Sequence, residues 1–346
     1  MFYQTRLRTI TLILALGFLA VYASFGSYFA REIVIEITIL AILAISLDFC
    51  AGFGGMVSLC HGAIMGISAY AFTIMSVKLG LPSVPSAMIG LMAAVVFSGL
   101  VGWVTARTSG IFFIMATLAF GQMAYTFFFK SRWLGGDDGM GGIDRFDLSW
   151  LGVDMNDALV FALFGIAVLL LVYVIAAILL RSGFGRILSG IHSNENRMQA
   201  VGINTANHKA MAMAASGLMA GIAGILAAQH TLYISPELLI WTVSGEVLLV
   251  VILGGIGTLI GPVVGAIMLV MLKHELSNYT DYWHMIVGMV LIFAVLAGGR
   301  GIFGQIEYWL ITRHPPKTQH LPPAREKDLA GGKAAIKGLW RYHGHP

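Results

Sequence analysis

Ionisable side chains are rare in the long apolar stretches of this 346-residue chain, and three of them could do chemistry there. Asp48, His61 and Glu246 lie in or beside such stretches, with Ser58 and Gln122 as polar companions. An ionisable residue inside a membrane is costly and commonly marks an ion or substrate pathway. We therefore expect these five residues to line a substrate pathway or to support interrupted helices.

The residues form no familiar catalytic pattern. The chain has no His-Glu-x-x-His helix, no paired intramembrane aspartates and no serine–histidine pattern. It also lacks a Gly-x4-Gly-Lys-Ser/Thr phosphate loop, because Gly332-Lys333-Ala334 has neither the upstream spacing nor the hydroxyl. Cys50 and Cys60 lie in apolar sequence and suggest neither a disulfide framework nor a metal site. We expect a chain that is not an enzyme and binds no cofactor or metal itself.

Two glycine-rich segments repeat each other and interrupt apolar runs. Gly54-Gly55-Met56-Val57-Ser58-Leu59 recurs as Gly254-Gly255-Ile256-Gly257-Thr258-Leu259. Paired interruptions of this kind point to a binding site at the bilayer midplane. Asp48 and Glu246 flank the two breaks, and we predict that they cap the half-helices, with substrate contact as the alternative. For His61 the alternatives are a hydrogen bond to a broken-helix carbonyl and a place on the pathway.

The elements that position these groups are membrane helices. Hydrophobic residues make up 58% of the chain and charged residues 11%, whereas soluble domains have about 25% charged residues. A spanning helix needs about 20 mainly apolar residues, so we predict an all-α polytopic membrane protein with about ten spans, within a range of about eight to eleven. The predicted spans are Ile10–Phe29, Ile33–Ala51, Gly62–Lys78, Pro85–Ala106, Ile111–Phe129, Ala158–Leu180, Ala210–Gln229, Val243–Ile256, Thr258–Leu272 and Tyr282–Ala297.

The basic residues set the expected orientation. Lys and Arg favour cytoplasmic loops, which places both termini and the loop 181–209 in the cytoplasm. The net charge of +4 gathers in short loops and the tail, and so indicates membrane orientation rather than nucleic-acid binding. We divide the chain into a permease domain, 1–312, and a proline-containing basic tail, 313–346, which we expect to be disordered or to lie on anionic lipid.

The polar segment from Arg181 to Lys209 separates two uncharged runs. We predict that Ser193 caps a short helix from Asn194 to about Val201, because its hydroxyl can accept from the free N–H groups of a first turn. Glu195 falls in that turn, where the helix dipole favours an acid. Gly202 can end the helix in a left-handed conformation. An ordinary basic loop is the alternative.

Several motifs along the chain resemble those of LivM-type permeases of ABC importers, the branched-chain amino acid family. They occur in the family's order and cover about Thr38 to Gly304. They are Ser58-Leu59-Cys60-His61-Gly62-Ala63, Thr117-Leu118-Ala119-Phe120-Gly121, Gly185-Arg186 with Asn194-Glu195-Asn196 and Ala200-Val201-Gly202-Ile203-Asn204, Ser216–Leu226, Glu246-Val247-Leu248 through Gly254–Pro262, and Arg300-Gly301.

The resemblance implies a permease subunit in a bacterial inner membrane. Its implied partners are a second, related permease, two cytoplasmic ATPase subunits that bind the ATP, and a periplasmic solute-binding protein. Arg186, Asn194, Glu195, Arg197 and Gly202 would then couple the chain to the ATPases. Branched-chain amino acids are the implied cargo, with urea, short amides or aromatic carboxylates as alternatives. An ion-coupled secondary transporter is the alternative from another class.

Overall fold

The computed structural model describes residues 6–147, 154–279, 282, 285–289, 292, 301 and 303–305. Most of the predicted tenth span, Tyr282–Ala297, and the whole tail, 313–346, lie outside these residues. The helices are α1 (Arg6–Phe25), α2 (Tyr28–Gly54), α3 (His61–Thr73), α4 (Ser83–Thr105), α5 (Ile111–Lys130), α6 (Ala158–Arg181), α7 (Gly183–Ser193), α8 (Glu195–Ala200), α9 (Thr205–Thr231), α10 (Trp241–Gly254) and α11 (Gly261–Tyr279).

Short elements complete the described chain. A π-helical turn, η1 (Ile74–Lys78), extends α3, and three 3-10 turns are η2 (Arg132–Leu134), η3 (Gly136–Asp138) and η5 (Pro236–Leu239). Strands β1 (Met140–Gly141) and β2 (Tyr233–Ile234) pair antiparallel, with Met140 opposite Ile234. Six of the described helices are long and apolar enough to cross a membrane, namely α1, α2, α4, α5, α6 and α9. The prediction of an all-α polytopic membrane protein is confirmed.

Helices α2 and α9 form the centre of the bundle, where small residues let neighbours approach closely. A Cβ added to Gly221 of α9 would lie 2.9 Å from the Cβ of Ala94 on α4. One added to Gly217 would lie 3.1 Å from the carbonyl oxygen of Ala94. Close contact between small residues is how membrane helices gain packing energy. The Gly217-x-x-x-Gly221 pair therefore packs helices, as its spacing predicts.

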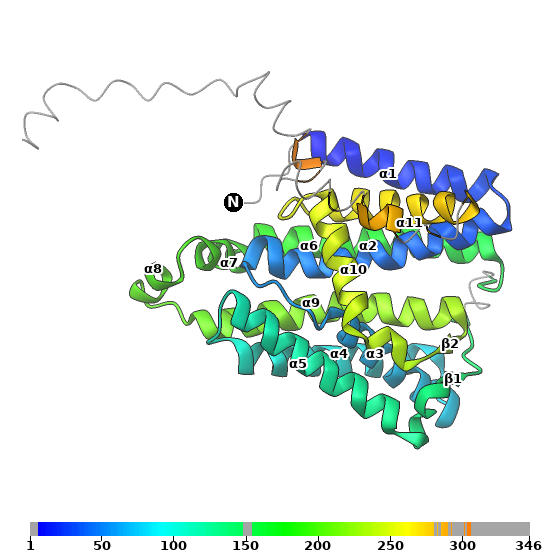
Figure 1. The fold of residues 1–346 in the computed structure, drawn as a ribbon, viewed down its shortest axis with the longest axis horizontal. Coiled ribbons are helices and arrows are strands. Elements are labelled where there is room, and N and C mark those ends of the chain that lie inside the picture. The colour runs from blue at the N-terminus through cyan, green and yellow to red at the C-terminus, as the bar shows by residue number, and fades with distance from the viewer. Residues whose placement is uncertain are drawn as a thin grey trace, which may run out of the picture. The chain divides into compact units, whose positions relative to one another are not determined.

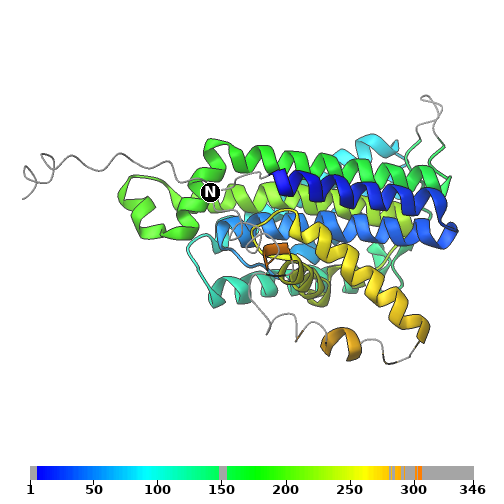
Figure 2. The same ribbon diagram turned by 90° about the horizontal axis from the view of Figure 1, so that it is seen from above.

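The polar segment and the β-ribbon lie at opposite ends of the bundle. Figures 1 and 2 both show α7 and α8 beyond one end of the long helices, and Figure 1 places β1 and β2 at the other. We call the end that carries α7 and α8 the coupling end.

The first two predicted spans need new boundaries. Helix α1 stops at Phe25, and α2 starts at Tyr28, several residues before the predicted start at Ile33. The prediction excluded the first residues of α2, which include Arg31 and Glu32. Glu32 has a partner in the bundle, because it lies 3.4 Å from His230 Nδ1. Glu36, which the predicted span included, lies 2.9 Å from His274 Nε2.

Candidate functional site

Helix α8 begins with a side-chain cap. Asn194 Oδ1 accepts a hydrogen bond from the backbone N–H of Arg197 at 2.9 Å, which satisfies one free donor of the first turn. The prediction that Ser193 caps α8 is wrong. Ser193 ends α7 instead, and its hydroxyl donates to the Ser189 carbonyl at 2.9 Å. The amide of Asn194, one residue later, takes the capping role.

The other end of α8 stops at glycine as predicted. Gly202 has φ +89°, its N–H donates to the Gln199 carbonyl at 2.9 Å, and the Ile203 N–H donates to the Met198 carbonyl at 3.1 Å. This pair of bonds is the Schellman arrangement, in which a left-handed residue satisfies the last helical carbonyls. The six-residue helix α8 is therefore held by hydrogen bonds at both of its ends.

A buried ion pair anchors α8 to the bundle. Glu195 Oε2 lies 2.6 Å from Lys209 Nζ, and the Lys209 side chain is only 6% exposed. Lys209 Nζ also donates to the Ala106 carbonyl, at the end of α4, at 3.4 Å. Gln199 adds a hydrogen bond to Thr205 at 3.0 Å. Lys209 was missed as a site residue, because the sequence shows only a basic residue where an apolar run begins.

Helix α7 was also missed. Its three glycines and two serines favour a loop, yet residues 183–193 form a continuous helix. Its buried residues, Gly185, Leu188 and Ile191, recur every three positions, which is the spacing of one helical face. That periodicity is the signal that could have identified α7 from the sequence.

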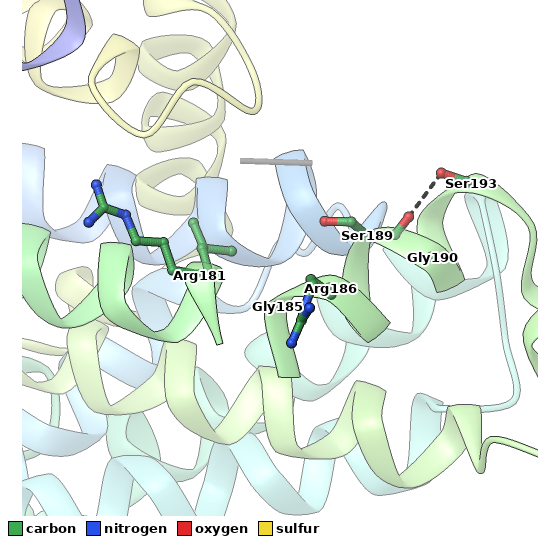
Figure 3. Close-up of a pocket in the computed structure, with 7 residues that line it drawn as sticks. Arg181, Gly185, Arg186, Ser189, Gly190 and Ser193 are labelled. Atoms are coloured by element: carbon green, nitrogen blue, oxygen red, sulfur yellow. Dashed lines mark hydrogen bonds between the residues drawn. The ribbon is translucent and has the colours of Figure 1, made fainter. Parts of the chain in front are cut away.

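Hollows open at the coupling end. One of about 550 Å³ lies between the end of α6 and α7, with Arg181, Arg186 and Ser189 in its lining. Figure 3 shows the side chains of Arg181 and Arg186 on these two elements, pointing away from each other. Another, about 460 Å³, is lined by residues of the α4–α5 connection, of α8 and of the α8–α9 connection, including Arg107 and Asn196.

Asp48 holds the second glycine-rich break. Its Oδ1 accepts from the Gly257 N–H at 2.6 Å and its Oδ2 from the Leu259 N–H at 3.0 Å. Leu259 has φ +63°, a conformation that non-glycine residues adopt at a cost. A Cβ on Gly52 would lie 2.6 Å from Gly257 Cα. The fully buried Asp48 therefore fixes a break that lies about 210 residues away in sequence.

His61 belongs to a chain of hydrogen bonds between three helices. His61 Nε2, at the start of α3, lies 2.7 Å from Ser216 Oγ on α9, and Ser216 donates to the Ser46 carbonyl on α2 at 2.6 Å. Ser216 therefore accepts from His61. The Nδ1 atom is buried without a hydrogen-bond partner among the described residues.

The first break runs from the coupling end into the bundle. Gly54 and Gly55 lie against α7, whereas the Leu59 N–H donates to Thr117 Oγ1, in the second turn of α5, at 3.1 Å. Ser58 Oγ accepts from the Cys60 N–H at 3.3 Å just before α3. Gly54–Gly55 ends a full-length α2 at the coupling end, and Gly257 lies beside Gly52. A binding site at the bilayer midplane stays a prediction.

Two short helices do begin inside the bundle. The N–H of Gly62, in the first turn of α3, donates to Ser244 Oγ, in the first turn of α10, at 2.9 Å. Gln122 is half-buried on α5, next to Gly121, and a Cβ on Gly121 would lie 3.4 Å from the Leu59 carbonyl oxygen. The first turn of α3 is thus surrounded by α5, α9 and α10.

Glu246 does not contact either break. It pairs with Lys273 of α11 at 2.9 Å, and Lys273 also lies 3.7 Å from Glu36 of α2. His274 then pairs with Glu36. The network joins α2, α10 and α11. Lys273, His274 and Glu36 were missed, since the sequence does not show which helices are neighbours.

A double-mutant cycle tests whether the network holds α10. Glu246→Gln and Lys273→Met should each lower the thermal stability of the detergent-solubilised protein, and the double variant should lose less than the sum. Since both side chains are partly exposed, we expect a coupling of about 1 kcal/mol or less. Lys273→Arg, which keeps the charge, is the control. Fully additive losses would contradict the pair.

These features define a class of protein. A bundle of membrane-length helices, two short helices that begin inside it and a fixed helical segment beyond one end together describe a multi-pass membrane transport subunit. The chain belongs to the family of branched-chain amino acid transport system permease components, whose sequence profile matches residues 29–296. A permease component is not itself an enzyme.

Two curated relatives are similar along most of the chain. The high-affinity branched-chain amino acid transport system permease protein LivM of Escherichia coli (strain K12) is 28% identical, over 75% of this chain and 67% of LivM. LivM of Salmonella typhimurium (strain LT2) is 25% identical, with the same two coverages. The predicted resemblance to LivM-type permeases is confirmed.

Proposed function

We propose that this chain is the permease subunit of an ABC importer that moves branched-chain amino acids into the cytoplasm. The observation that carries the proposal is α8. It is capped by Asn194, ended by Gly202 and tied to α9 by the Glu195–Lys209 pair. A short helix held in this way beyond the bundle can be displaced by a partner and can transmit that displacement as a rigid body.

The charge at the coupling end supports a cytoplasmic position for α8. Arg107, Arg181, Arg186 and Arg197 are all exposed there, and basic residues favour the cytoplasmic side. In this proposal two ATPase subunits contact α8 and the neighbouring Arg186, and both termini are cytoplasmic. A second, related permease completes the pathway, and a periplasmic solute-binding protein delivers the cargo at the opposite end.

The chain would contribute movement rather than chemistry. ATP would bind to the partner subunits, since this sequence contains no Gly-x4-Gly-Lys-Ser/Thr loop. Closure of the ATPases would displace α8, and the Glu195–Lys209 pair would carry that displacement to α9 and to the end of α4. The long helices would then change between outward and inward access as packed bodies.

Purification of the tagged chain from its native membrane tests the composition, and reconstitution tests the activity. We expect two ATPase subunits and a second permease to co-purify. In proteoliposomes with the solute-binding protein, leucine uptake should require ATP, whereas urea, acetamide and benzoate should not compete. Uptake that persists without ATP and collapses with an ion gradient would reject the proposal in favour of ion-coupled transport.

Gly202→Pro should abolish ATP-driven uptake without preventing membrane insertion. Proline fixes φ near −65° and removes the N–H, whereas position 202 needs φ +89° and donates to Gln199. Uptake and membrane content are the measurements. Gly80→Pro is the matched control, because Gly80 has φ +65° with no atom within 4 Å of an added Cβ and lies in the η1–α4 connection, far from α8. Equal uptake by the two variants would contradict the role of α8.

A further inference from the structure

We infer that α7 transmits the movement of α8 to the first glycine-rich break, and that His192 and Leu188 are the positioning residues that do so. The inference rests on the proposed function and adds a second route from the coupling end into the pathway. The first route, through Glu195 and Lys209, leads to α9. The second leads to α3, one of the two short helices that begin inside the bundle.

Two side chains of α7 contact the break directly. Leu188 and His192 are four residues apart and so lie on one face of α7. A Cβ on Gly54 would lie 3.2 Å from Leu188 Cδ1. A Cβ on Gly55 would overlap His192 Nδ1 and lie 3.0 Å from its Cε1. The imidazole therefore rests directly on the backbone of Gly55, and Leu188 is fully buried beside it.

Helices α7 and α8 are tied together. The Asn194 N–H donates to the Gly190 carbonyl at 3.0 Å, so the residue that caps α8 also continues the last turn of α7. A Cβ on Gly190 would lie 2.8 Å from Met198 Sδ, which shows how closely α8 packs back on α7. A displacement of α8 must therefore move α7 as well.

The break leads from this contact to the inner end of α3. Gly55 has φ +68°, so the chain reverses there at the end of α2. Residues 55–60 then carry no helix, and the Leu59 N–H holds them to Thr117 of α5. The next residues form the first turn of α3, where Gly62 donates to Ser244 of α10. Movement of Gly55 would therefore shift the first turn of α3, where α3 meets α10.

A hollow beside the contact gives the break room to move. Its volume is about 280 Å³, and its lining includes Gly55, Met56, Ser109, His192 and Asn194. It is bounded by the break, by the α4–α5 connection and by the junction of α7 and α8. The backbone of Gly55 is thus supported by His192 on one side and borders open space, an arrangement in which a push from α7 can displace it.

The test uses the complete importer in proteoliposomes, with leucine uptake and ATP hydrolysis measured on the same preparation. His192→Ala removes the ring from Gly55, and we expect uptake per ATP hydrolysed to fall by about tenfold, a size typical of a residue that carries coupling. His192→Asn keeps a polar atom near the position of Nδ1 and should restore most of the ratio. A change in this ratio separates coupling from a loss of folded protein.

His208→Ala is the matched control. It also removes an imidazole that contacts α7, since its ring lies 6.1 Å from that of Phe184, but it does not touch the break. We expect its ratio of uptake to hydrolysis to stay close to that of the wild type. A normal ratio for His192→Ala, or an equal fall for His208→Ala, would overturn the inference. A wild-type importer without ATP-driven uptake would instead reject the proposed function.

A cross-link provides a second measurement that does not depend on His192. A Cβ at position 54 would lie 3.6 Å from Leu188 Cγ, so the pair Gly54→Cys and Leu188→Cys places two sulfurs within bonding reach. The native Cys50 and Cys60 are buried. Uptake per ATP should be the same before and after oxidation, because α7 and the break move together. Loss of uptake on oxidation, reversed by reductant, would overturn the inference.

Discussion

Charge reversal at Glu195 is expected to abolish ATP-driven uptake while leaving membrane insertion intact. Glu195→Lys would place a second ammonium group where a carboxylate now lies 2.6 Å from the nearly buried Lys209. Breaking a buried pair costs about 3–5 kcal/mol, and the 30% exposure of Glu195 places this case at or below the lower end. We expect α8 to detach from α9. Uptake in proteoliposomes and the membrane content of the variant are the measurements.

Two further variants identify the cause of that loss. Asn196→Lys also adds a lysine to α8, at an exposed position and without removing a carboxylate, and should retain uptake. The exchange Glu195→Lys with Lys209→Glu restores opposite charges, and should recover part of the uptake. Uptake by the single reversal at the wild-type rate would show that the pair does not carry the coupling. No recovery by the exchange would mean that the two charges have separate roles.

Asp48→Asn is expected to have the second large effect, on the stability of the bundle and hence on transport. Both carboxyl oxygens of Asp48 accept backbone N–H groups. An amide can accept only one of them and turns its own NH2 toward the other. A buried donor left without an acceptor costs about 1–3 kcal/mol, here at a break where Leu259 already adopts a positive φ. We expect a lower thermal midpoint in detergent and little uptake.

The same substitution at Asp137 is the control for Asp48→Asn. Asp137 is exposed in η3, so Asp137→Asn removes a carboxylate without removing a buried acceptor. Its thermal midpoint should equal that of the wild type. If Asp48→Asn were as stable as this control, the two hydrogen bonds to the break would not be holding it.

Local sequence rules predicted the parts of the site that are local in the chain. Gly202 ends α8 because only a few residues tolerate a left-handed conformation at a helix end, and this requirement is visible without a structure. The start of α8 was misplaced by one residue, because Ser193 and Asn194 are both good caps and α7 decides between them. Helix α7 itself was obscured by its glycines, which lower helix propensity although tertiary packing compensates for it.

The contacts between distant segments could not be predicted in the same way. Asp48 and Gly257 are 209 residues apart, and nothing in either segment indicates the other. The charges of α2 illustrate the converse. Glu32 shortened the predicted span, yet its histidine partner on α9 allows the helix to begin before it. The charges in a sequence segment describe that helix in isolation, whereas neighbouring helices of the bundle supply the side chains that pair with those charges.

The hydrogen bond between Gly62 and Ser244 has a consequence for the energetics of transport. Helices α3 and α10 have 13 and 14 residues, about 20 Å each, and the five residues of η1 extend α3, so each remains shorter than the roughly 30 Å hydrocarbon layer. In such a helix the first N–H groups lie where water is absent, and a serine hydroxyl takes the place of water. Separating the two inner ends therefore breaks one side-chain bond, worth about 1 kcal/mol, and leaves the backbone bonds of the long helices intact.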